Sequence, residues 1–165
     1  MPKHLIDRLR PDSILEFRAA ARERYQDGLA ARDSGRRTAA VYLFGYTAEM
    51  VLKAAYFRLI GYPEGQNISM AQLKAAQKPA ITNFAWQGSL HSLESWAKLL
   101  VSTRASRPDL AYPVPNFGAK VVDTVRRITS SWRENMRYHK NIAYPHEVTR
   151  VEEATRWLLE NSAKL

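Results

Sequence analysis

One stretch of the chain, residues 36–59, most constrains the fold. Its apolar stripe recurs every three or four residues, through Ala40, Leu43, Phe44, Thr47, Met50, Val51 and Ala54. This spacing places the stripe on one broad face of an α-helix, and Gly61 with Pro63 ends the helix. Because no other segment is as apolar, we expect this helix to be the central one, covered by the others.

The same periodicity predicts further helices along the chain. We expect them over residues 13–34, 70–77, 89–103, 116–132 and 145–158. Ser13 (or Asp12), Ser69 and Asn116 are suitable N-caps for three of them. No stretch alternates in the manner of a β-strand. We therefore predict an all-α fold, an up-and-down bundle of four to five helices forming a single domain over residues 1–165.

Composition limits the classes of protein and of site. The chain has 165 residues, 45% hydrophobic and 25% charged, which is typical of a globular domain. It contains no apolar run near the roughly 18 residues of a membrane span, and residues 1–10 lack the apolar part of a signal peptide. We expect no membrane association and a cytoplasmic location. The absence of cysteine excludes disulfides and thiolate sites, and four scattered histidines predict neither a metal site nor a cofactor.

The charge balance indicates an anionic partner. Lysine and arginine number 25 against 16 acidic residues, giving a net charge of +9 and a pI of about 10.0. The excess is densest over residues 101–140, where we expect RNA or nucleotide phosphates to contact Arg126, Arg127, Arg137 and Lys140. A basic protein without such a partner is the alternative.

Arg133 and His139 form one candidate catalytic pair. Arginine can stabilise charge on a phosphate while histidine transfers a proton, so the pair could cleave RNA without a metal ion. An arginine at this spacing before a histidine is expected about once by chance in this chain, as a rough estimate. The alternative is a surface arginine and an unrelated histidine.

A polar cluster lies inside the most apolar segment. Glu49 and Lys53 form an i, i+4 pair. A buried Glu49 would need a further partner, and we expect Arg137 to form a structural ion pair with it.

We expect Gly45 to permit a close helix approach. His91, near the start of a predicted helix, is expected to cap or pack rather than react. We expect that the rings of three tyrosines could stack on RNA bases: Tyr112, Tyr138 and Tyr144.

Three segments together resemble the HEPN family. They are residues 40–54 with the following turn at Gly61 and Pro63, residues 91–94, and residues 132–138. The resemblance spans about residues 12–160. It implies a bundle of four or five helices that often dimerises, and a composite cleft in which Arg133 and His139 cleave RNA without a metal ion. It also implies a toxin or defence role, with a nucleotidyltransferase-like antitoxin as a possible partner.

The resemblance leaves an alternative open. Many bacterial relatives that carry the Gly-Tyr-x-x-Glu-x-x-Leu-Lys string, here residues 45–53, and a later Arg-Tyr pair, here Arg137 and Tyr138, look non-catalytic. In that case the chain is a helical module that binds a nucleotide or a partner protein, and His139 has no catalytic role.

Overall fold

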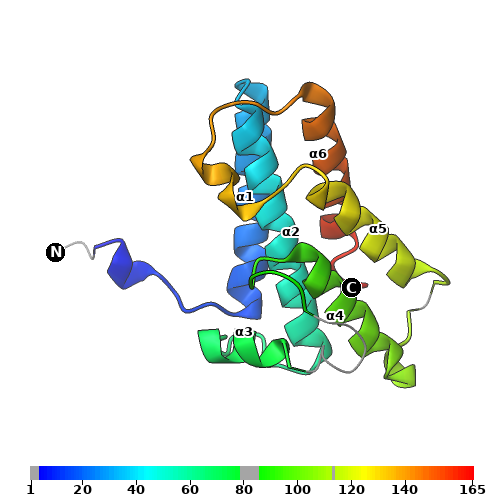
Figure 1. The fold of residues 1–165 in the computed structure, drawn as a ribbon. Helices are drawn as coiled ribbons and strands as arrows, with labels where there is room; N and C mark the ends of the chain where they lie inside the picture. The colour runs from blue at the N-terminus through cyan, green and yellow to red at the C-terminus, as the bar shows by residue number, and fades with distance from the viewer. Residues whose placement is uncertain (1–3, 79–85, 113) are drawn as a thin grey trace.

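The computed structural model describes residues 4–78, 86–112 and 114–165, and within these ranges every regular element is helical. The α-helices are α1 (Ile14–Asp33), α2 (Arg37–Leu59), α3 (Met70–Ala76), α4 (Leu93–Ala105), α5 (Phe117–Thr129) and α6 (Pro145–Glu160) (Figure 1). Short 3-10 helices are η1 (Ile6–Arg8), η3 (Pro108–Leu110) and η4 (Glu134–Tyr138). The predicted all-α class is confirmed. No helix in the described ranges is both long and apolar enough to cross a bilayer.

Helix α2 is the centre of the molecule, as its sequence predicts. It packs against α1, α4 and α6, and α1 lies along most of its length (Figure 1). Buried residues occur on all sides of α2, from Thr38 to Leu59, instead of on one face. A helix covered all round must be apolar all round, which explains why the expected stripe describes only part of its core residues.

Most helix boundaries follow local signals in the sequence. The side chain of Ser13 accepts a hydrogen bond from the backbone N–H of Glu16 (3.1 Å), and Ser69 caps α3. Two expectations are corrected. Helix α4 begins only at Leu93, after a turn in which Gly88 has a φ of 82°. Asn116 is left-handed (φ 61°) and makes no side-chain cap bond; an asparagine tolerates that conformation in a turn.

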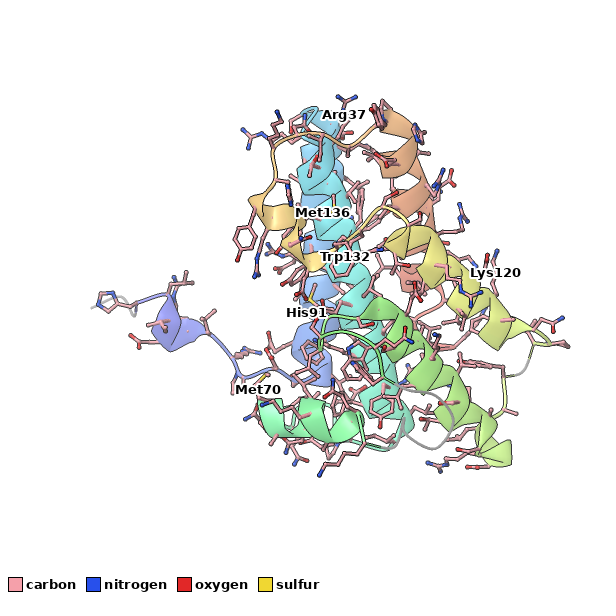
Figure 2. All side chains as sticks on the ribbon, viewed as in Figure 1. Arg37, Met70, His91, Lys120, Trp132 and Met136 are labelled. Carbon is pink, nitrogen blue, oxygen red and sulfur yellow. The ribbon has the colours of Figure 1, made fainter. Side chains whose placement is uncertain are left out.

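Residues 130–144 connect α5 to α6 and are attached to α2 at two places. At the first, the indole of Trp132 (labelled in Figure 2) packs on Gly45 and donates a hydrogen bond to the carbonyl of Tyr42 (3.1 Å). A Cβ at Gly45 would lie 2.1 Å from the indole. The close approach at Gly45 is therefore made by an indole from the segment after α5, and the expected close approach of a helix is corrected. Helix α5 ends at Thr129, three residues before the predicted Trp132.

The second attachment is at the beginning of α2. Thr38 Oγ1 accepts hydrogen bonds from the backbone N–H groups of Ile142 (2.7 Å) and Ala143 (2.9 Å). In return, Asn141 Oδ1 accepts one from the backbone N–H of Thr38 (3.0 Å). The segment that carries Arg133, Arg137, His139 and Lys140 is thus held at both ends by one helix.

Candidate functional site

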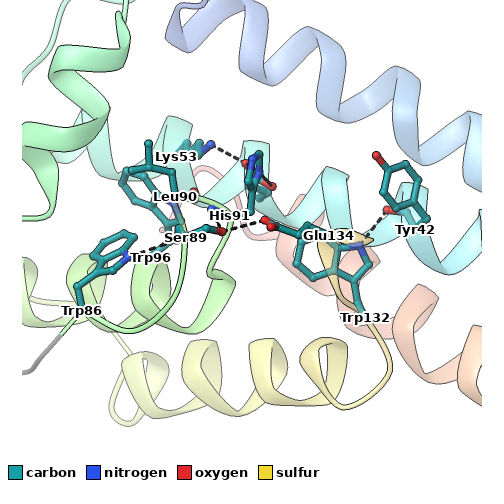
Figure 3. A network of polar contacts seen from close by, with 10 residues as sticks. Tyr42, Lys53, Trp86, Ser89, Leu90, His91, Trp96, Trp132 and Glu134 are labelled. Atoms are coloured by element: carbon teal, nitrogen blue, oxygen red, sulfur yellow. Dashed lines mark hydrogen bonds and ion pairs between the residues drawn. The ribbon is translucent and has the colours of Figure 1, made fainter. Parts of the chain in front are cut away.

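A cavity of about 650 Å³ lies where the start of α4 meets residues 129–135. We call it the α4 cavity. Its charged lining residues are His91, Glu94, Lys98, Arg133 and Glu134. Two hydrogen bonds join its walls: Thr129 Oγ1 donates to Glu94 (2.8 Å), and Ser89 Oγ donates to Glu134 (2.8 Å). These bonds fix the spacing between α4 and the segment after α5, and Figure 3 shows Ser89 and Glu134 facing each other.

The buried carboxylate of Glu49 contacts His91, one of the residues that line the cavity. Glu49 on α2 is only 3% exposed, and its carboxylate accepts a hydrogen bond from Lys53 Nζ at 2.5 Å. The same carboxylate contacts Nδ1 of His91 at 2.9 and 3.0 Å (Figure 3). A buried carboxylate needs such partners because an uncompensated charge is costly inside a protein. The i, i+4 pair of Glu49 and Lys53 is confirmed.

The expected ion pair between Glu49 and Arg137 is corrected by this geometry. Lys53 and His91 occupy the Glu49 carboxylate, whereas the guanidinium of Arg137 lies over the ring of the exposed Tyr138, 4.7 Å from its centre. Arg137 belongs to η4, at the surface, and Glu49 faces the interior beside α4. The buried Glu49 does have a further partner, as its burial predicts, but that partner is His91 from the turn before α4.

The contact with Glu49 sets the chemistry of His91. The hydrogen bond that the His91 imidazole donates to the Glu49 carboxylate raises the pKa of His91 above its usual 6.5, although partial burial opposes this. Nδ1 is engaged by Glu49, which leaves Nε2 as the nitrogen that can exchange a proton with a molecule in the cavity. A carboxylate that orients an imidazole through one nitrogen is an arrangement suited to acid–base catalysis.

Arg133 and His139 occupy different surroundings. Arg133 lines the α4 cavity, and its Nη1 donates hydrogen bonds to the carbonyls of Thr129 and Trp132. His139 is exposed, follows η4 and is not a lining residue of that cavity. Within one chain, the cavity therefore contains Arg133 with His91. The sequence pattern indicates only capping or packing for His91, because its partner Glu49 is 42 positions away and no local spacing connects the two residues.

The other expected phosphate contacts lie on α5 and on the segment after it. Arg126, Arg137 and Lys140 are exposed, while Arg127 is half-buried and donates to Glu153 on α6 (3.2 Å).

The expected base-stacking rings differ in exposure. Tyr138 and Tyr144 are 75% and 64% exposed. The expectation that Tyr112 stacks on bases is corrected, because the guanidinium of Arg104 lies over its ring, 4.6 Å from the ring centre.

In the described part of the chain, no three histidine or acidic side chains are grouped to hold a metal ion. Comparison with family models, with curated proteins and with solved structures gave no match.

Proposed function

We propose that this protein is a HEPN-like, metal-independent endoribonuclease that acts at the α4 cavity. One observation carries the proposal: the cavity contains a cation, Arg133, together with a histidine, His91, that a buried carboxylate orients. RNA cleavage without a metal needs these two functions. Nε2 of the histidine accepts the proton of a 2′-hydroxyl, and the arginine stabilises the negative charge that develops on the phosphate.

The proposed reaction is an intramolecular transfer. The 2′-oxygen attacks the adjacent phosphorus, the bond to the 5′-oxygen breaks, and that oxygen takes a proton from water while His91 returns the proton it accepted to the solvent. The products carry a 2′,3′-cyclic phosphate and a 5′-hydroxyl. His139, which matches the spacing after Arg133 that the family resemblance implies, is the competing proton-transfer group. In that competing assignment, the exposed His139 would act in a cleft shared with the second copy of the homodimer that the resemblance implies.

Basic residues in the cavity, on α5 and on the segment after it supply the binding part of the proposal. Lys98 lines the cavity, and Arg126, Arg137 and Lys140 are exposed on α5 and the segment after it. Each phosphate that they neutralise releases counterions, so RNA affinity must fall steeply as salt rises. An affinity that stays flat between 50 and roughly 200 mM salt contradicts an electrostatic RNA surface. A cytoplasmic toxin or defence role, with an antitoxin as partner, belongs to the same proposal.

Cleavage of end-labelled RNA of mixed sequence in excess EDTA tests the assignment. We expect wild type to cut, and His91→Ala to lose activity while His139→Ala and the control His146→Ala retain it. His146 is exposed at the start of α6 and stacks on Tyr144. Loss in His139→Ala alone would instead assign the chemistry to His139. Circular dichroism and thermal unfolding of each variant separate loss of chemistry from loss of fold.

A non-catalytic module is the second candidate, and one observation favours it. The guanidinium of Arg133 already hydrogen-bonds two carbonyls at the end of α5, which is a common structural role for a basic side chain near a helix C-terminus. In that case the protein binds a nucleotide or a partner protein, such as a nucleotidyltransferase-like protein. Retarded but intact RNA with wild type, in EDTA and in magnesium, would support this function over cleavage.

A further inference from the structure

A second cavity, of about 510 Å³, lies between α1, α2 and the end of α6. We call it the α1 cavity, and it shares no lining residue with the α4 cavity. Small or aliphatic side chains form much of its wall: Ala21, Val51, Ala54, Ala55 and Leu159. Its volume is within the range of roughly 300–1,000 Å³ that is common for small-molecule sites. The three alanines leave the space that larger core side chains would fill.

Arginines converge on this apolar wall. Arg18 and Arg22 of α1 and Arg58 of α2 line the cavity, against one acidic lining residue, Glu160. Arg18 is already paired with Glu64 (2.5 Å). For Arg22 and Arg58, no carboxylate partner occurs in the part of the chain that the structure describes.

Arg58 is the most informative of the three. It is half-buried, and its Nη2 donates hydrogen bonds to the carbonyls of Ser162 (3.1 Å) and Ala163 (3.2 Å). Burial lowers the pKa of Arg58, the positive charges of Arg18 and Arg104 lower it further, and the carboxylate of Glu64 only partly opposes them. The two carbonyls accept from Nη2 without neutralising the charge of the guanidinium. An anion bound in the cavity would supply the missing countercharge.

We propose that the α1 cavity binds a small organic anion that has one acidic group and an apolar body. The acidic group lies against Arg22 and Arg58, and the apolar body contacts Val51 and the alanines. A bare inorganic anion cannot use the aliphatic wall, and a neutral apolar molecule cannot use the guanidinium groups. Burial raises the pKa of Tyr25, another lining residue, so its hydroxyl stays protonated and available as a donor. This proposal does not depend on RNA cleavage.

Phenyl phosphate is a suitable probe, and the full-length protein labelled with ¹⁵N provides the readout. We expect saturable shifts of backbone amide resonances along α1 and α2 at the cavity, with binding at least roughly tenfold tighter than that of inorganic phosphate or of benzyl alcohol. Equal affinity for inorganic phosphate would overturn the proposal, because the apolar wall would then contribute nothing. Equal affinity for benzyl alcohol would overturn it because the arginines would contribute nothing.

A matched pair of variants locates the site. Arg22→Gln removes an exposed cation from the cavity, and Arg24→Gln removes one from the same helix outside it, where Arg24 pairs with Asp27 (3.0 Å). Both positions are exposed, so the fold should survive either change. We expect phenyl phosphate affinity to fall roughly tenfold in Arg22→Gln and to stay within about twofold in Arg24→Gln. Equal effects of the two changes would indicate general attraction to a basic surface and would overturn the proposal.

Discussion

We predict that Gly45→Ala destabilises the fold, because the indole of Trp132 already occupies the space that the added methyl group would need. In Gly45→Ala, the added Cβ would lie 2.1 Å from Cδ1 and Nε1 of Trp132. The indole must move, and its hydrogen bond to the carbonyl of Tyr42 breaks. Trp132 is 3% exposed, so its displacement costs most of the packing that holds residues 130–135 against α2.

The magnitude follows from opposing contributions. Complete loss of a buried tryptophan side chain costs about 3–5 kcal/mol. Alanine in place of a mid-helix glycine returns about 1 kcal/mol. We therefore expect Gly45→Ala to lower the free energy of unfolding by about 2–4 kcal/mol. For a chain of this length, that change corresponds to a fall in Tm of roughly 5–15 °C.

Urea unfolding followed by circular dichroism measures the change, with Gly65→Ala as the control. A Cβ at Gly65 has only Leu15 nearby, at 4.0 Å, so we expect a change within about 0.5 kcal/mol. A double-mutant cycle with Trp132→Leu isolates the contact, since Gly45→Ala should cost far less once the indole is absent. Stability of Gly45→Ala equal to or above that of wild type would refute the packing argument.

Two further predictions concern other parts of the site. Thr38→Val removes the acceptor for the backbone N–H groups of Ile142 and Ala143, and we expect a loss of about 1–3 kcal/mol in urea unfolding; no loss would mean that water replaces the hydroxyl. His91, paired with Glu49, has a folded-state pKa above 6.5, so the charged pair stabilises the fold fully below about pH 6.5 and less as the pH rises through that pKa. The stability difference between wild type and His91→Gln should therefore shrink from pH 6 to 8, and a difference that grows would contradict the assigned shift.

The sequence predicts the helices well because each is encoded locally. Apolar spacing marks α1, α2 and α6, and Ser13 and Ser69 are correct caps. The errors occur where contacts between distant segments decide the backbone. Gly88 and the turn after it delay the start of α4, and α5 ends early because Trp132 turns back onto Gly45. The end of α5 has no local signal that distinguishes it from a continuing helix, whereas the start of α4 has one that the prediction missed, the N-cap Ser92, whose side chain accepts a hydrogen bond from the backbone N–H of Ser95.

The site was less predictable than the helices. A carboxylate within an apolar helix correctly indicates a buried charge that needs partners, and Lys53 follows from the i, i+4 spacing. The second partner cannot be chosen from spacing, since any cation or histidine brought near by folding would satisfy the same requirement. His91 and Arg137 were both compatible with the sequence, and only the packing of α4 against α2 distinguishes them.

The two attachments of residues 130–144 have a mechanical consequence. Thr38 and Gly45 are seven residues apart on α2, a rise of about 10 Å, whereas Trp132 and Asn141, nine residues apart, could be separated by roughly 30 Å in an extended chain. The surplus length is taken up in η4. Because both anchors belong to one helix, the segment moves with α2 when α5 or α6 shifts. Its surface side chains can therefore rearrange around a bound molecule while both ends stay fixed on the core.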